Sequence, residues 1–175
     1  MVEAIQQETH KLYTLIYVFN NDNTKVLLGL KKRGFGMGRW NGFGGKVESG
    51  ESIYDGAIRE LKEESNLDAK NLEKKAIMYF KFEDNPIIID VHLYTTSNIS
   101  GDPVESEEML PRWYDVPDLP YGFMWPDNKI WHPWLFEGKL FTATFYFKAD
   151  QTTITGYKHS FVSSLKELEA AKFDS

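Results

Sequence analysis

The sequence has no cysteine, no long apolar run and no excess of basic residues. Without cysteine, the chain cannot form a disulfide, a thiolate zinc site, an iron–sulfur cluster or a cysteine nucleophile. Its longest apolar stretches, such as residues 12–19, are much shorter than the ~20 residues that cross a bilayer. With 20 basic against 26 acidic residues and a formal charge of −6, it lacks the positive surface that sequence-independent binding to a nucleic-acid polymer requires.

The N-terminal residues contain no basic segment followed by an apolar run, so they do not form a signal peptide. We therefore expect a soluble protein of the cytoplasm, with the nucleus and the mitochondrion as further compartments and no membrane partner. No apolar stripe suggests a contact face for a second copy, so we expect a monomer. A chain of 175 residues corresponds to one domain, which buries ~70% of the surface of its unfolded form.

Apolar periodicity and turn signals predict a single mixed α/β (α+β) domain over residues 12–160. Residues 1–11 are expected to form a flexible leader, and residues 161–175 a tail that contains a short, solvated helix. Strands are predicted over residues 12–19, 25–30, 76–82, 87–95, 109–114, 140–147 and 152–157, and helices over residues 52–67 and 128–137. This order is not the strict alternation of a doubly wound parallel sheet.

The helix predicted over residues 52–67 has recognisable signals at both ends. Ser52 is suited to the N-cap, because its hydroxyl can accept a hydrogen bond from the first turn. Ile53, Ala57 and Leu61 follow at intervals of four and form an apolar face. Asn66 stands where the helix should end, and Asn tolerates the left-handed conformation of a C-terminal cap.

Glycine is concentrated just before this helix, where residues 34–50 hold seven of the 13 glycines. Such a loop turns sharply or approaches another group closely. It is not a Walker loop, because Lys46 is followed by Val47 instead of Ser or Thr, and the dinucleotide-binding Gly-x-Gly-x-x-Gly pattern is also absent. The sequence contains neither the Gly-x-Ser-x-Gly elbow nor a His-Glu-x-x-His pair.

The polar side of the predicted helix carries three carboxylates, from Glu60, Glu63 and Glu64. Their spacing places them on one face within a single turn, where like charges repel one another. One interpretation is a solvated acidic surface, which is the usual meaning of a run of charges. The alternative is a site for a hard divalent cation, since Mg²⁺ prefers oxygen ligands and is commonly shared between carboxylates and substrate phosphates.

The chain resembles the Nudix box at Gly45, at Glu51 and along the run Arg59-Glu60-Leu61-x-Glu63-Glu64-x-Asn66-Leu67. It departs from the family pattern only at Asn66, where the pattern has Gly. The match is long and chemically specific, and it favours the metal-binding interpretation of the acidic triplet over the solvated surface.

Segments outside the box are similar to the animal homologues of the MutT enzymes, over residues 12–15, 31–47, 90–92, 103–106, 108–109 and 124–127. This resemblance implies the Nudix fold, a mixed β-sheet sandwiched between helices with a loop–helix motif. It also implies hydrolysis of oxidised purine nucleoside triphosphates, such as 8-oxo-dGTP and 2-hydroxy-dATP, to the monophosphate and pyrophosphate. Water is then the nucleophile, Mg²⁺ the cofactor, for which Mn²⁺ can substitute, and a small-molecule nucleotide the partner.

The same resemblance implies roles for the catalytic residues. The implied metal ligands are the backbone of Gly44 and the carboxylates of Glu60, Glu63, Glu64 and Glu108. Glu64 is our choice of general base, with Glu108 or another carboxylate of the box as the alternative. Arg59 orients the carboxylates without touching the substrate, and Lys31 and Lys46 are candidates for binding the phosphates.

The implied base pocket is aromatic. Its residues, together with the glycines of the loop, are Thr14, Phe35, Asn41, Phe43, Gly44, Gly45, Phe80, Trp125, Pro126, Asp127, Asn128, Trp131 and Phe147. Stacking on rings supports any base, so selectivity must come from polar groups. The enzymes resembled here have two adjacent Asp residues where this chain has Asp127 and Asn128. We expect Asp127 to accept hydrogen bonds from an oxidised guanine and Asn128 to donate one to its carbonyl.

Two other functions stay open at this point. The chain could be a Nudix pyrophosphohydrolase for another modified or an ordinary purine nucleoside triphosphate, and Asn128 is the main reason for keeping that alternative. It could also be a Nudix-shaped binding module without turnover, although the intact acidic triplet speaks against this. The histidines, at positions 10, 92, 132 and 159, form no ligand spacing and are interpreted as structural or surface residues.

Overall fold

The computed structural model describes residues 8–173. Its main sheet has eight strands, β1 (Thr9–Phe19), β2 (Lys25–Lys31), β3 (Trp40–Asn41), β5 (Glu73–Phe82), β6 (Ile87–Thr96), β8 (Met109–Asp115), β9 (Leu140–Phe147) and β10 (Ile154–Val162). A short ribbon is formed by β4 (Asp68–Ala69) and β7 (Ile99–Ser100), and the helices are α1 (Ile53–Ser65), α2 (Asn128–Phe136) and α3 (Leu165–Ala170). Single 3₁₀ turns lie at Val116–Asp118 and Tyr121–Phe123.

The strands of the main sheet lie in the order β10-β9-β5-β6-β1-β2-β3, and β8 pairs with β2. The β1–β6 and β5–β9 pairs are parallel, and the other pairs of the sheet are antiparallel. The sheet is therefore mixed, as the sequence predicted. Strands that are distant in the sequence, β1 and β6, are joined along almost their entire length.

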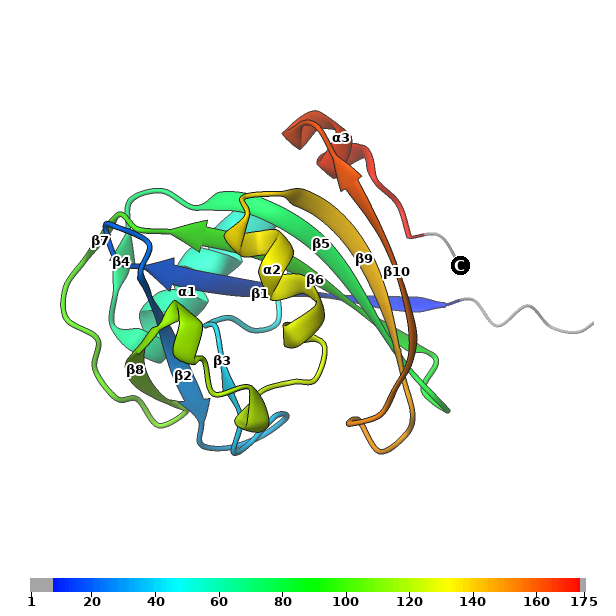
Figure 1. Ribbon diagram of the computed structural model, residues 1–175, viewed down its shortest axis with the longest axis horizontal. Helices are drawn as coiled ribbons and strands as arrows, with labels where there is room; N and C mark the ends of the chain where they lie inside the picture. Colours follow the sequence, from blue (N-terminus) through cyan, green and yellow to red (C-terminus); the bar gives the residue numbers. More distant parts are fainter. Residues whose placement is uncertain (1–7, 174–175) are drawn as a thin grey trace, which may run out of the picture.

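Helices cover both faces of this sheet (Figure 1). Alternate residues of β1 point to opposite faces, so Tyr17 packs with Trp131 of α2 while Ile16 packs with Leu61 of α1. The third helix, α3, packs on a separate cluster around Ile77. The predicted arrangement of a mixed sheet sandwiched between helices is confirmed.

The ends of α1 are formed as its sequence predicts. The Ser52 hydroxyl accepts a hydrogen bond of 3.0 Å from the Asp55 amide, which satisfies one of the free donors of the first turn. At the other end, Asn66 has φ of 64°, and its amide donates to the Lys62 carbonyl. The residue that departs from the family pattern therefore provides the same left-handed cap.

The predicted leader and tail are corrected by the structure. Strand β1 begins at Thr9, three residues before the expected start, and pairs with β6 from its first residue. Residues 1–7 of the predicted leader lie outside the described residues. Strand β10 continues to Val162, and α3 is not a solvated helix, because Leu168 is fully buried against Ile77 and Ile88.

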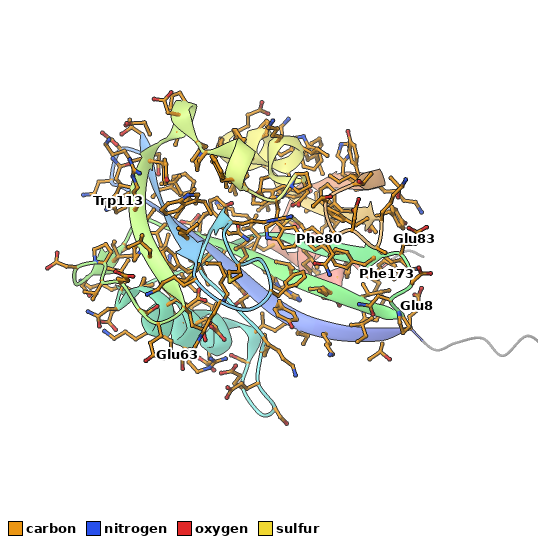
Figure 2. The ribbon with its side chains drawn as sticks, turned by 90° about the horizontal axis from the view of Figure 1, so that it is seen from below. Glu8, Glu63, Phe80, Glu83, Trp113 and Phe173 are labelled. Carbon is orange, nitrogen blue, oxygen red and sulfur yellow. The ribbon has the colours of Figure 1, made fainter. Side chains whose placement is uncertain are left out.

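The C-terminal segment also contacts the start of the chain. Phe173 packs on the rings of His10 and Tyr79, and the Lys81 ammonium lies 5.7 Å from the Phe173 ring centroid. Figure 2 shows Phe173 close to Glu8, which accepts a hydrogen bond from Lys81. The residues of the predicted tail thus form part of the fold, and the boundary at residue 160 has no structural counterpart.

Replacing Leu168 by Ala tests whether α3 belongs to the cooperative unit. Because this side chain is fully buried, the substitution should lower the free energy of unfolding by about 2–5 kcal/mol, as measured by urea denaturation. The matched control is Leu165→Ala on the same helix, where the side chain is 52% exposed and the change should stay within about 0.5 kcal/mol. Equal effects of the two substitutions would contradict the packing of α3.

Candidate active site

A cavity of about 500 Å³ opens on the side of the sheet that α2 covers. Its walls come from β1, the loop between β2 and β3, β5, β6 and the segment that leads into α2. The cavity brings together many of the residues predicted for the site: Thr14, Lys31, Phe35, Asn41, Gly44, Gly45, Glu64, Phe80, Glu108, Trp125, Asp127, Asn128 and Trp131. One end is charged and the other is aromatic.

The glycine-rich loop approaches β1 and α1 so closely that a side chain would not fit. Gly44 has φ of 148°, and a Cβ atom there would collide with the Thr14 carbonyl. A Cβ on Gly45 would lie 2.6 Å from Oε1 of Glu60. The loop is also bonded to β1, since the Thr14 amide donates to the Gly45 carbonyl at 2.9 Å. The glycines therefore let the backbone contact the acidic helix directly.

Glu64 points from α1 into the charged end of the cavity and is only 3% exposed. One carboxylate oxygen accepts from the Gly44 amide at 3.0 Å and the other from Nζ of Lys31 at 3.3 Å. Burial raises the pKa of Glu64 to about 7, although both hydrogen bonds act in the opposite direction. Its carboxyl group therefore exchanges a proton near neutral pH, which suits a general base.

Arg59 holds the neighbouring carboxylates outside the cavity wall. Its guanidinium donates to Glu51 at 2.6 Å, to Glu60 at 3.0 Å and to Glu63 at 3.2 Å, and also to the carbonyl of Lys46. Hydrogen bonding to Arg59 lowers the pKa of Glu51 to about 2. Figure 2 places Glu63 at the outer side of α1, where its side chain is 58% exposed. The expected positioning role of Arg59 agrees with these contacts.

Lys31 and Arg33 bring positive charge to the other rim of the charged end. Nζ of Lys31 donates to Glu108 at 2.9 Å as well as to Glu64, and Arg33 donates to Glu108 at 3.1 Å. These bonds lower the pKa of Glu108 from its ordinary value, with the Lys31 bond as the largest cause. Glu108 thus stays ionised, and Lys31 lies between it and the buried Glu64, with a hydrogen bond to each.

The donor set of this end fits a hard divalent cation in chemistry. It consists only of oxygen atoms, from the carboxylates of Glu60, Glu64 and Glu108 and the Gly44 backbone. The charges of Glu63 and Glu108 add to burial in raising the pKa of Glu60, which shows that the carboxylates are near enough to repel. Within residues 8–173, no three acidic or histidine side chains are grouped closely enough to hold a metal ion as they stand. Lys31 and Arg59 form hydrogen bonds with these carboxylates.

The other end of the cavity is lined by rings. The centroids of Phe35 and Trp125 lie 5.0 Å apart, and Phe80 stacks on Phe145 at 5.4 Å with an interplanar angle of 18°. Figure 2 shows Phe80 on the β5 ribbon, between the two helical layers. Phe35 is 56% exposed and stands at the mouth. This end can hold a flat aromatic ligand by stacking.

Two buried polar side chains, Asp127 and Asn128, stand at the aromatic end where α2 begins. Oδ2 of Asp127 accepts from the Trp131 indole at 2.7 Å, which leaves Oδ1 for a ligand. Burial raises the pKa of Asp127 to about 6, against the lowering effect of that bond. Oδ1 of Asn128 is buried and has no hydrogen-bond partner among the described residues. Both residues are therefore placed to read the edge of a ligand.

Several predicted pocket residues do not line the cavity. Phe43 is fully buried in the core on the α1 side, because alternate residues of its segment face opposite sides of the sheet. Phe147 packs behind Phe80, with their centroids 6.2 Å apart, and Pro126 also lies outside the wall. The Lys46 side chain is exposed, and only its carbonyl takes part, through the bond from Arg59.

Sequence reasoning missed Arg39 and the surroundings of His132. The Arg39 guanidinium lies 3.9 Å from the centroid of the Trp125 ring and lines the cavity, a position that the Gly-rich loop sequence alone does not reveal. His132 is completely buried, with its two ring nitrogens bonded to the hydroxyls of Tyr17 and Tyr121. The sequence feature that could have indicated the burial of His132 was its position next to Trp131 on a predicted helix.

Comparisons with known proteins agree with this geometry. The NUDIX domain family matches residues 9–135. An oxidized purine nucleoside triphosphate hydrolase of Mus musculus is 46% identical over 93% of this chain and 98% of its own length. The protein of that name from Danio rerio is 43% identical over 83% of this chain and 92% of its own. A mutator MutT protein from Bacillus halodurans has a structure with a TM-score of 0.71, at 26% identity over 85% of this chain and 97% of its own.

The chain therefore belongs to the Nudix family. Its fold and its loop–helix motif are those predicted from the resemblance at Gly45, Glu51 and residues 59–67. Nudix hydrolases act on small-molecule nucleotides and generally need a divalent metal. In the described part of the chain, no helix is both long and apolar enough to span a membrane.

The raised pKa of Asp127 makes a testable contribution to stability. Between about pH 4 and pH 6 the folded protein retains a proton that the unfolded chain releases, so the free energy of unfolding should fall as the pH rises through this window. Asp127→Asn removes the titrating group and should lose this part of the pH dependence in urea denaturation. The exposed Asp102→Asn is the matched control. Parallel pH curves for the wild type and Asp127→Asn would contradict the assignment.

Proposed function

We propose that this protein hydrolyses oxidised purine nucleoside triphosphates, such as 8-oxo-dGTP, to the monophosphate and pyrophosphate, and so removes them from the nucleotide pool. The observation that supports it is a single cavity that joins the acidic helix to an aromatic pocket with a buried Asp and Asn at its end. The name of the Mus musculus relative, which aligns over nearly all of this chain, indicates the same substrates.

The charged end supports a role in phosphate chemistry. A divalent cation, Mg²⁺ in this proposal with Mn²⁺ able to replace it, neutralises phosphate charge and acidifies water when bound. We assign its ligands to Glu60, Glu63, Glu64, Glu108 and the Gly44 backbone. Lys31 and Arg59, which engage these carboxylates in the structure, would then exchange them for the cation, and Lys31 would become free to contact a phosphate.

Glu64 is assigned as the general base. It is the most buried carboxylate of the charged end, and in its ionised form it can accept a proton from water. The Gly44 amide fixes the orientation of its carboxylate by a hydrogen bond of 3.0 Å. Arg59 does not line the cavity and acts as a positioning residue for Glu60 and Glu63.

The aromatic end is assigned to the base. Phe35, Phe80 and Trp125 support its ring by stacking, which favours no particular base. Asp127 accepts hydrogen bonds from the edge of the base through its free Oδ1, and Asn128 forms a further hydrogen bond with the same edge. An amide presents either its NH₂ or its oxygen, so Asn128 donates to the carbonyl of an oxidised guanine when the NH₂ is turned inward.

A second substrate is favoured by one observation. Oδ1 of Asn128 has no protein partner in the described structure, so a base with a donor on its edge could satisfy it equally well. Another modified or an ordinary purine nucleoside triphosphate is therefore the alternative substrate. We further propose that the protein acts as a cytoplasmic monomer and binds no nucleic-acid polymer.

Glu64→Gln tests the catalytic assignment. Because the amide cannot accept the proton from water, we expect kcat for Mg²⁺-dependent pyrophosphate release from 8-oxo-dGTP to fall by about 10²–10⁴-fold. The assay is run in parallel with 2-hydroxy-dATP, dGTP and dATP. Glu107→Gln, an 88% exposed glutamate next to Glu108, is the matched control and should retain full activity. Retained activity in Glu64→Gln would exclude it as the base, and no preference over dGTP would move the function to another substrate.

Asn128→Asp tests the assignment of the base edge. Two adjacent carboxyl groups share a proton, so the variant can present a donor or an acceptor according to pH. We expect the ratio of kcat/KM for 8-oxo-dGTP to that for 2-hydroxy-dATP to change by about tenfold and to become pH-dependent. Pre-steady-state binding of each nucleotide provides a check on KM. Unchanged ratios and unchanged pH–rate profiles would refute the role of Asn128.

A further inference from the structure

Behind the aromatic end of the cavity, His132 joins two tyrosine hydroxyls. Nε2 of His132 lies 2.8 Å from the hydroxyl of Tyr17 on β1, and Nδ1 lies 3.0 Å from the hydroxyl of Tyr121 in the 3₁₀ turn before α2. Tyr17 and His132 are completely buried. The Tyr17 hydroxyl also lies 3.3 Å from Oδ1 of Asn41, a residue of the cavity wall. These four side chains form a continuous line from α2 to the cavity, across the sheet face that α2 covers in Figure 1.

Only one tautomer of His132 satisfies every group in this line. With the proton on Nε2, the imidazole donates to Tyr17, the Tyr17 hydroxyl donates to Asn41, and Nδ1 accepts from Tyr121. With the proton on Nδ1, the Tyr17 hydroxyl must donate to His132, and its bond to Asn41 is lost. The first arrangement contains one more hydrogen bond among buried groups, which makes it the favoured one.

Burial supports a neutral His132. It lowers the pKa of the imidazole to about 3, so at neutral pH one ring nitrogen carries a proton and the other accepts. Rings of Tyr17, Trp131 and Phe136 pack around it with centroids 4.4–5.2 Å away, which holds the imidazole plane in place. The direction of the hydrogen bonds is thus set inside the protein, before any ligand binds.

The line ends on the amide oxygen of Asn41. This oxygen also accepts from the Gly42 amide at 2.9 Å, so two donors converge on it. A rotated amide would place its NH₂ against the Gly42 N–H, donor against donor. The NH₂ group is therefore the polar part of Asn41 that remains for a bound molecule, and it meets that molecule as a hydrogen-bond donor.

We propose that Tyr121, His132 and Tyr17 form a directional hydrogen-bond relay that fixes Asn41 as a donor to the purine base. His132 and Tyr17 are positioning residues, since they act through Asn41 and do not touch the ligand. With Asp127 as an acceptor on the same cavity, the site then presents a fixed acceptor and a fixed donor. The inference rests on the proposed function only in that the ligand is a purine nucleotide.

The tautomer is tested first, on the full-length protein without nucleotide. In protein carrying ¹⁵N-labelled histidine, the ring correlations of His132 should show a proton on Nε2 and none on Nδ1. Asn41→Ala removes the acceptor of the Tyr17 hydroxyl, which leaves the two tautomers with equal numbers of hydrogen bonds, so it should increase the Nδ1-protonated fraction. A proton on Nδ1 in the wild type, or a tautomer ratio that Asn41→Ala leaves unchanged, would overturn the relay. This result does not depend on which substrate the enzyme uses.

Tyr17→Phe then tests the effect on substrate. It keeps the ring that packs on Trp131 and removes only the hydroxyl. We expect KM for 8-oxo-dGTP to rise about three- to tenfold, the factor for one lost hydrogen bond, while kcat changes by less than about twofold. The double variant with Asn41→Ala should have the KM of Asn41→Ala alone, because Tyr17 acts only through Asn41.

Tyr94→Phe is the matched control, because it removes the hydroxyl of another buried tyrosine that does not line the cavity. It should leave KM unchanged. An equal KM for Tyr17→Phe and Tyr94→Phe, or additive effects of Tyr17→Phe and Asn41→Ala, would overturn the proposal. If the wild type prefers a purine triphosphate other than 8-oxo-dGTP, the proposed substrate is wrong. The KM values of Tyr17→Phe and Tyr94→Phe are then compared with the preferred nucleotide, and this comparison tests the relay in the same way.

Discussion

The hydrogen bond from the Gly44 amide to the Glu64 carboxylate ties the glycine-rich loop to α1, and the charged end of the cavity depends on it. The bond requires backbone within reach of a buried helix face, which is why Gly44 and Gly45 have no room for a side chain. Burial next to this loop is also what raises the pKa of Glu64. One close approach therefore both orients this carboxylate and tunes its protonation.

Much of this end could be predicted because its signals are local. The Ser52 and Asn66 caps, the apolar face of α1 and the i, i+3, i+4 spacing of the glutamates are all set within one helix. Strand β9 is predicted with its observed bounds, Leu140–Phe147. The spacing does not reveal that Arg59 engages Glu60 and Glu63, nor that Glu64 is the one of the three helix glutamates that lines the cavity, since both depend on where the loop crosses the helix.

The errors arise where tertiary contacts decide. The two-residue strands β3, β4 and β7 are too short to show a period of two, and they form because a partner strand lies beside them. Phe43 resembles a pocket residue but faces the core, because one step along an extended segment changes the face of the sheet. The tail appears solvated in sequence, yet Leu168 and Phe173 pack on β5 and β6 from more than seventy residues away.

At the aromatic end, the rings supply affinity for the base and the polar groups supply selectivity. Its rings hold any flat base, so discrimination depends on polar groups whose donor or acceptor character is fixed before binding. The Trp131 indole fixes Asp127 as an acceptor, and Gly42 with Tyr17 fixes Asn41 as a donor. Asn128 has no such partner for its oxygen within the described residues and stays free to turn. A base that matches the two fixed groups is therefore selected first, and Asn128 adapts to whatever third group that base presents.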